Sequence, residues 1–309
     1  MAGGHPADLA VTAPTNPTGG RPLPRGLLSV HALPADHHDG PWDDILVPEG
    51  TKERLLSQTL LRLRHGRALR NLPGMPHGLI VLAGPPGTGK TTLARGLAQA
   101  AARALAPIGA TTYIEIDPHA FPSEMLGESQ RNITRLMTDV LPEFAARRPH
   151  TVVLVDEVES FAVRRSAASF GSNPVDVHRA TDAVLAGIDF LAQEHPRTVF
   201  VATTNFPEAV DEAFLSRADL VLNLDLPDEA TIAAILHRTL AELAGMWEGA
   251  RPLVRDDGLH RKLAARCAGW DGRRVRKLVL TALAQRREVA LDPNLLEADD
   301  LIAAVEAGG

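Results

Sequence analysis

The chain has 309 residues, 45% of them hydrophobic and 23% charged, which is sufficient for one large core and a smaller second domain. Its net charge of -6 argues against broad binding to nucleic acid, because such binding needs a basic excess. The single cysteine, Cys267, favours a reducing, cytoplasmic location, and neither an apolar run of ~20 residues nor a secretory signal is present to indicate a membrane.

The first part of the chain divides into a tail and a helix. Residues 1–40 are rich in Pro, Gly and His with weak periodicity, which predicts a flexible tail. A helix is predicted over 51–69, where Leu56, Leu60 and Leu63 recur at helical spacing. Its arginines either face solvent or another subunit, which we favour, or contact a nucleic acid: Arg54, Arg62, Arg64 and Arg67.

Short apolar runs alternate with helical stretches in the middle of the chain. Three runs are almost continuously apolar, as in strands of a parallel sheet that is covered on both faces: 79–83, 152–155 and 199–202. A weaker strand is expected at 113–116, and 220–226 alternates as a half-exposed strand near a sheet edge does. After Pro227 only helices are predicted: 228–244, 259–268, 272–290 and 295–307.

A phosphate-binding loop joins the first apolar run to a helix predicted at 91–106. It fits the pattern G-x-x-x-x-G-K-[ST] with Gly84, Pro85, Pro86, Gly87, Thr88, Gly89, Lys90 and Thr91. Its glycines let the backbone wrap around phosphate, and the helix N-terminus adds partial positive charge. We expect Lys90 to reach the β- and γ-phosphates of ATP, and Thr91 to hold Mg²⁺ with Thr92 beside it in the cradle.

Two carboxylates end the second apolar run. Asp156 is expected to hold Mg²⁺, and Glu157 to orient and polarise an attacking water. The predicted fold is therefore α/β, with a P-loop parallel sheet sandwiched by helices and followed by a small helical lid domain. The expected domains are the tail at 1–40, a nucleotide-binding domain at 41–226 and the lid at 227–309.

Three later segments resemble the sensor 1, arginine finger and sensor 2 motifs of AAA+ ATPases: 203–205, 211–219 and 272–278. The resemblance implies that Asn205 senses the γ-phosphate and that Arg217 reaches the nucleotide of a neighbouring subunit. It further implies that Arg273 contacts phosphate from the lid, while Asp44 and Ile45 lie beside adenine. An arginine finger supplied in trans implies a homo-oligomeric ring, which we expect to be a hexamer.

Within that family the chain resembles the pachytene-checkpoint branch, whose members remodel HORMA-domain proteins. The segment 154–161 with its Glu-Val-Glu-Ser run carries most of this resemblance, together with 42–45 and 216–219. The short region ahead of residue 42 is similar to bacterial members that accompany HORMA proteins in antiphage signalling operons. The implied partner is a HORMA-domain substrate that the ring partly unfolds or disassembles by threading it through a central pore.

The expected substrate-gripping loop departs from the usual pattern. Segment 122–129 aligns with it, but Met125 stands where an aromatic residue is common, followed by Leu126. Methionine is long and adaptable, so it can still hold a threaded chain. Packing of both side chains into the core is the alternative.

Other functions stay open at this stage. The chain is alternatively an AAA+ unfoldase with a different substrate, or a clamp-loader or helicase-loader type of machine supported by its basic stretches. A nucleotide-dependent scaffold without turnover is a further alternative, against which Glu157, Asn205 and Arg217 argue together.

Overall fold

The computed structural model describes residues 22–35, 42–43, 45–121, 127–160, 162 and 174–308. A six-stranded sheet lies at the centre of these residues, in the order β1-β3-β4-β5-β2-β6. The strands are β1 (Leu27–Leu33), β2 (Leu79–Ala83), β3 (Thr111–Ile116), β4 (His150–Val155), β5 (Thr198–Thr204) and β6 (Ala218–Asn223). Strands β2 to β6 pair in parallel, and β1 runs antiparallel to β3.

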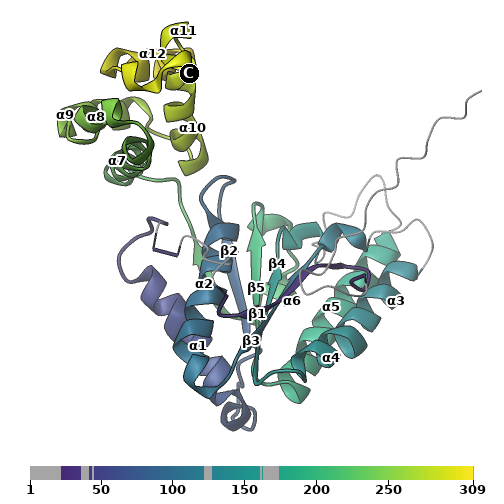
Figure 1. Ribbon diagram of the computed structural model, residues 1–309. Helices are drawn as coiled ribbons and strands as arrows, with labels where there is room; N and C mark the ends of the chain where they lie inside the picture. The colour runs from purple at the N-terminus through teal and green to yellow at the C-terminus, as the bar shows by residue number, and fades with distance from the viewer. Residues whose placement is uncertain are drawn as a thin grey trace, which may run out of the picture.

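Helices cover both faces of this sheet (Figure 1). On one face lie α1 (Thr51–Leu69) and α2 (Lys90–Leu105). On the other lie α3 (Glu128–Arg135), the π-helical turn η4 (Leu136–Val140), α4 (Leu141–Ala145), α5 (Pro174–Glu194) and α6 (Glu212–Leu215). The predicted sandwich is therefore confirmed, and the alternating segment does form an edge strand, β6.

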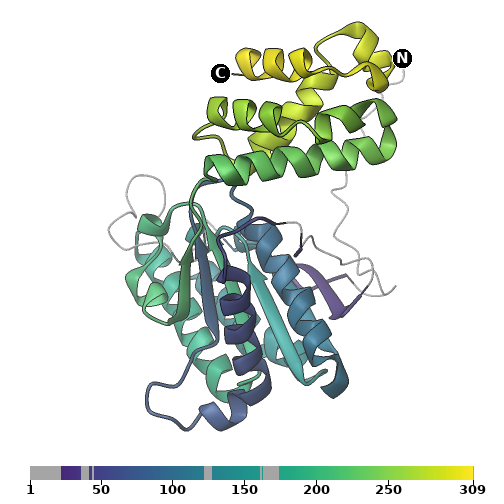
Figure 2. The ribbon, with the colours of Figure 1, turned by 90° about the vertical axis from the view of Figure 1, so that its left-hand side faces the viewer.

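A helical lid follows the sheet and has its own hydrophobic core. It consists of α7 (Glu229–Met246), α8 (Arg251–Val254), α9 (Asp257–Arg266), α10 (Gly272–Leu283), α11 (Arg287–Leu291) and α12 (Ala298–Ala307). Figure 2 shows it stacked beyond the end of the sheet at which the P-loop lies. None of the helices in the described ranges combines the length and apolarity that a bilayer span requires.

Strand β1 corrects the prediction of a flexible tail over 1–40. Leu27, Val30 and Leu33 are buried, and Val30 pairs with Ile114 of β3. The backbone groups of β1 complete a hydrogen-bonded ladder that would otherwise end at β3. The pairing depends on β3, which lies far along the chain, so the composition of residues 1–40 did not predict a strand there.

Arg62 of α1 corrects the prediction that the arginines of this helix face solvent or another subunit. Its guanidinium is buried and donates hydrogen bonds to the carbonyls of Pro76 at 2.8 Å and Ala192 at 3.2 Å. Burial lowers its pKa, an effect opposed by the nearby carboxylate of Asp219. Arg62 therefore holds α1 against the sheet, whereas Arg64 and Arg67 are exposed.

An ion pair divides the helix predicted over 272–290 into α10 and α11. Between them Arg286 has an extended backbone, with φ −121° and ψ 139°. Its side chain bonds Asp300 through Nε at 2.6 Å and Nη2 at 2.8 Å. The buried carboxylate of Asp300 also accepts the backbone N–H of Glu297, which completes a capping box on α12. This tertiary contact outweighs the local preference for a continuous helix.

Replacing Asp300 should destabilise the lid. Asp300→Asn is expected to reduce the free energy of unfolding by about 1–3 kcal/mol, because a charged hydrogen bond to Arg286 is lost. The hydrogen bond from Arg286 lowers the pKa of Asp300, so its contribution is present above the ordinary value near 3.9 and disappears as pH falls through the folded pKa. Urea titrations from neutral to acidic pH measure this difference, with exposed Asp299→Asn as control. Equal losses in both variants at neutral pH would contradict the assignment.

Candidate nucleotide-binding site

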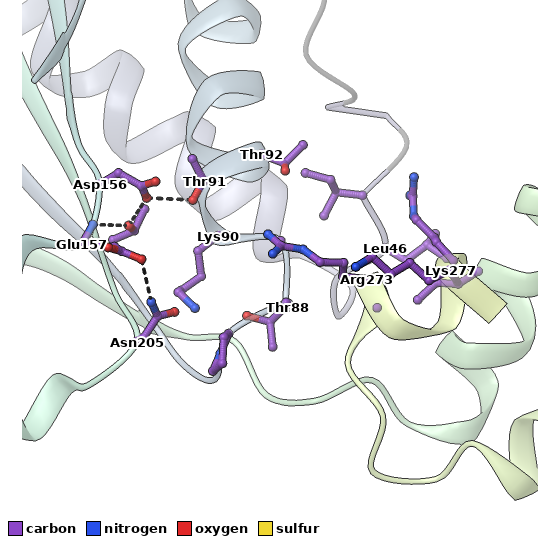
Figure 3. Close-up of a pocket in the computed structure, with 18 of the residues that line it drawn as sticks. Leu46, Thr88, Lys90, Thr91, Thr92, Asp156, Glu157, Asn205, Arg273 and Lys277 are labelled. Atoms are coloured by element: carbon purple, nitrogen blue, oxygen red, sulfur yellow. Dashed lines mark hydrogen bonds between the residues drawn. The ribbon is translucent and has the colours of Figure 1, made fainter. Parts of the chain in front are cut away.

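A cavity of about 460 Å³ lies between the P-loop, the ends of β4 and β5, and α10 of the lid (Figure 3). The predicted residues that line it are Ile45, Pro86, Gly87, Thr88, Gly89, Lys90, Thr91, Thr92, Asp156, Glu157, Asn205 and Arg273. Residues separated by almost 230 positions thus converge on one site. The structure thereby brings together these twelve predicted residues, whereas Gly84 and Pro85 of the P-loop do not line the cavity.

The P-loop folds around the amine of Lys90. This amine is buried and donates to the carbonyls of Gly84 and Pro85, each at 2.7 Å. Burial lowers the pKa of Lys90, while the nearby carboxylates, Glu159 first among them, act in the opposite direction. The two carbonyl contacts keep the amine inside the loop that would surround a phosphate.

Gly87 joins the P-loop to the lid. Its φ is 79°, and a Cβ there would clash with the carboxylate of Asp271. Only glycine fits both this conformation and this close approach. Asp271 in turn caps α10 by accepting the backbone N–H of Arg274 at 2.9 Å.

The carboxylate of Asp156 accepts hydrogen bonds from two threonine side chains at the carboxyl end of the sheet. Its Oδ1 accepts from Thr91 Oγ1 at 2.7 Å and from Thr203 Oγ1 at 2.5 Å. Thr203, which was not predicted as a site residue, also accepts the backbone N–H of Glu157 at 3.1 Å. It directly follows the apolar run 199–202 and lies in the segment 203–205 that resembles sensor 1, and that position is the signal by which sequence reasoning could have found it.

The oxygen atoms gathered around Asp156 are suitable ligands for magnesium. One carboxylate and two hydroxyl groups supply hard oxygen ligands, and Mg²⁺ in nucleotide sites usually takes few protein ligands besides phosphates and water. No group of three or more His, Cys, Asp or Glu residues suited to a metal occurs within the described ranges. The residues therefore suit an ion that arrives with a nucleotide, with Thr91 and Asp156 as the nearest protein oxygens.

Glu157 has a strained backbone and two side-chain partners. Its φ is 54°, and it is the only non-glycine residue of positive φ among those described. Asn205 Nδ2 donates to Oε1 at 3.3 Å, and His119 Nε2 lies 3.3 Å from Oε2. His119 was not predicted; it follows β3 directly, at the same edge of the sheet. The half-exposed carboxylate is thus oriented from both sides.

The lid contributes three cations to the pocket. Arg273, Arg276 and Lys277 lie at i, i+3 and i+4 on α10, and Arg273 extends toward the P-loop (Figure 3). Only Arg273 was predicted, although the helical spacing of the other two already placed them on its face. Apolar side chains complete the cavity, namely Ile45, Leu46, Ile235 and Leu280.

Arg217 does not line the pocket of its own chain. It forms a two-pronged contact with Asp189, Nε to Oδ1 and Nη2 to Oδ2, both at 2.9 Å. Its Nη1 donates to the carbonyl of Ala213 at 2.9 Å, and the hydrogen bond to Asp189 raises the pKa of Arg217. Three further predicted residues lie outside the described ranges: Asp44, Met125 and Leu126.

Sequence comparisons give this geometry a family context. The model of the ATPase family associated with various cellular activities (AAA) matches residues 80–226. CD-NTase-associated protein 6 of Pseudomonas aeruginosa is 41% identical over 290 residues, which cover 94% of each chain. A pachytene checkpoint protein 2 homolog of Danio rerio is 34% identical over 68% of this chain and 50% of its own. The chain thus spans about half the length of that relative.

Solved structures share the fold. The structure of C. elegans PCH-2 has a TM-score of 0.72 at 24% identity, covering 90% of this chain and 74% of its own. A chain from an E. coli MS115-1 HORMA:CdnC:Trip13 complex has a TM-score of 0.74 at 18% identity, covering 91% and 95%. The chain therefore belongs to the AAA ATPase family, on the branch that contains CD-NTase-associated protein 6 and the pachytene checkpoint protein 2 homologues.

Proposed function

We propose that this protein is a Mg²⁺-dependent ATP hydrolase that forms a homohexameric ring and remodels a HORMA-domain protein in antiphage signalling. The observation that carries the proposal is the single pocket in which the P-loop, the acid pair, Asn205 and the cations of α10 meet. The 41% identity with CD-NTase-associated protein 6 over nearly the whole chain supports the same assignment.

Different side chains of the pocket are proposed to contact the phosphates, the metal ion and the adenine of ATP. Lys90 exchanges its carbonyl partners for phosphate oxygens, and Arg273 neutralises phosphate charge from the lid. Thr91 and Asp156 would hold Mg²⁺, which would supply positive charge against the triphosphate. The apolar side chains of Ile45 and Leu46 form the proposed adenine side of the site.

Glu157 is the proposed base that orients the attacking water. Its Oε1 is held by Asn205, so the amide and the carboxylate together fix the position of the water relative to the phosphate. The contact between Thr203 and the backbone N–H of Glu157 fixes the strained turn from which this carboxylate projects. Hydrolysis then needs no covalent bond to the protein.

The proposed ring rests on the resemblance of Arg217 to an arginine finger, and Arg217 does lie outside its own pocket. To reach a nucleotide held by another copy, its guanidinium would have to exchange Asp189 for phosphate oxygens. A finger supplied in trans contributes ~10³–10⁵ in rate, so an isolated chain would hydrolyse ATP slowly. We therefore propose that turnover depends on assembly.

The proposed substrate is a HORMA-domain protein. A chain of the same fold occurs in a complex with HORMA and CdnC, and the pachytene checkpoint relatives lie on the same branch. We further propose that the ring draws an extended segment of this protein through a central pore, with Met125 and Leu126 as the gripping residues. Incubating the ring with ATP and a preformed HORMA–peptide complex, and following peptide release by fluorescence, tests the remodelling activity. Release that requires neither ATP nor Glu157 would refute it.

Removing the proposed base should separate binding from hydrolysis. Glu157→Gln is expected to bind ATP with little change in affinity, because Lys90 and Arg273 remain, while turnover falls by ~10²–10⁴. Fluorescent-nucleotide titration and phosphate release measure the two quantities, and omission of Mg²⁺ should abolish turnover in the parent protein. Turnover within threefold of the parent, roughly the scatter of such assays, would exclude Glu157 as the base.

Removing the proposed finger should leave each pocket intact but inactive. Arg217→Ala is expected to bind nucleotide and to lower turnover by ~10³–10⁵. Arg147→Ala, which removes an exposed arginine paired with Glu143, is the matched control and should keep full activity. Mixing Arg217→Ala with Glu157→Gln should restore some turnover, because an intact Glu157 then meets an intact Arg217 across a boundary. Failure of any rescue in mixed rings would count against action in trans.

A further inference from the structure

A second polar groove lies between α3 and α5, apart from the nucleotide pocket. Arg131 and Arg135 of α3 and Arg179 of α5 line it, together with Gln130 and Thr134. The two helices pack side by side on one face of the sheet (Figure 1). The groove measures about 500 Å³ and shares no lining residue with the nucleotide pocket.

The lining of this groove carries an excess of positive charge. None of its three guanidinium groups forms an ion pair with a carboxylate among the described residues, and each residue is exposed. Of the carboxylates nearby, Glu128 pairs with Arg25, and Asp139 lines the groove itself and accepts from Thr138 Oγ1. Three cations against one carboxylate favour an anionic partner.

We propose that this groove binds an acidic, extended segment of the protein substrate. Arg131 and Arg135 lie four residues apart, and Gln130 and Thr134 form a parallel row on the same helix. The first row suits carboxylates, because guanidinium groups bind them in a two-pronged manner. The second row suits peptide N–H and C=O groups, since amide and hydroxyl side chains both donate and accept.

The length of the groove fits a peptide. Its lining residues run from Gly127 to Asp139, so the helical rise of 1.5 Å per residue gives a length of about 18 Å. An extended chain advances about 3.3 Å per residue, so about five residues fill the groove. The inference rests on the proposed function only in identifying the occupant as the substrate.

The chemistry of the groove favours polypeptide over nucleic acid. Among the described residues that line it there is no aromatic side chain on which bases could stack, and Asp139 places a negative charge at one end. The net charge of -6 would also repel a long polyanion. A short acidic peptide needs no stacking surface, and it is repelled less because its negative charges are few and spaced along the chain.

Peptide binding to the full chain tests the proposal. The probe is a fluorescein-labelled peptide of alternating Glu and Ser, compared by anisotropy with the same peptide carrying Gln in place of Glu. We expect the acidic peptide to bind more tightly, and the double variant Arg131→Gln/Arg135→Gln to weaken it by roughly three- to thirtyfold. The matched control is Arg64→Gln/Arg67→Gln on α1, which removes the same charge from exposed arginines on the opposite face and should not change affinity.

Each alternative outcome overturns the inference in its own way. If the two peptides bind equally, or if neither binds, the groove does not recognise acidic side chains. If both double variants lose the same affinity, the effect comes from the net charge of the protein and not from this groove. A smaller ring in Arg131→Gln/Arg135→Gln would make the groove a subunit contact. Tighter binding of single-stranded oligo-dT, lost in that variant, would assign the groove to nucleic acid. Binding is measured without turnover, and the groove variant should keep basal ATP hydrolysis, so failure of the proposed enzyme function would appear separately.

Discussion

One carboxylate oxygen joins the three segments on which the site depends. Oδ1 of Asp156 accepts hydrogen bonds from Thr91, at the start of α2, and from Thr203, at the end of β5. Because parallel strands all end at one edge of the sheet, an acceptor at the end of β4 can reach both of its partners. The P-loop, the turn at Glu157 and the Asn205 amide are thereby held in one arrangement.

The parts of this arrangement that sequence predicted are those determined locally. The P-loop, the acid pair and the continuously apolar strands each carry their signal within a few residues, and α1 was found with the predicted bounds, Thr51–Leu69. The features that the sequence did not predict depend on contacts with residues far along the chain. Strand β1 needs β3, and Arg62 reaches carbonyls 14 and 130 residues away. The gap between α10 and α11 likewise needs Asp300.

Arginine has different roles in different parts of this chain. Arg62 and Arg286 are structural, since their donors are satisfied by carbonyls or by a buried carboxylate. Arg217 is paired but lies outside its own pocket, whereas Arg273 lines the pocket without a carboxylate partner among the described residues. Composition alone cannot distinguish these roles, because the distinction is whether an acceptor of the same chain is within reach. Arg62, in the basic stretch of α1 that first suggested nucleic-acid binding, is buried and therefore cannot contact a nucleic acid.

The contact between Gly87 and Asp271 has a mechanical consequence. The side chain that starts α10 rests directly on the backbone of the P-loop, with no space for even a methyl group between them. A rotation of the lid that carries Asp271 with it must therefore either displace the loop or break this contact. The orientation of the helical domain is thus linked to the conformation of the P-loop through the contact between Asp271 and Gly87.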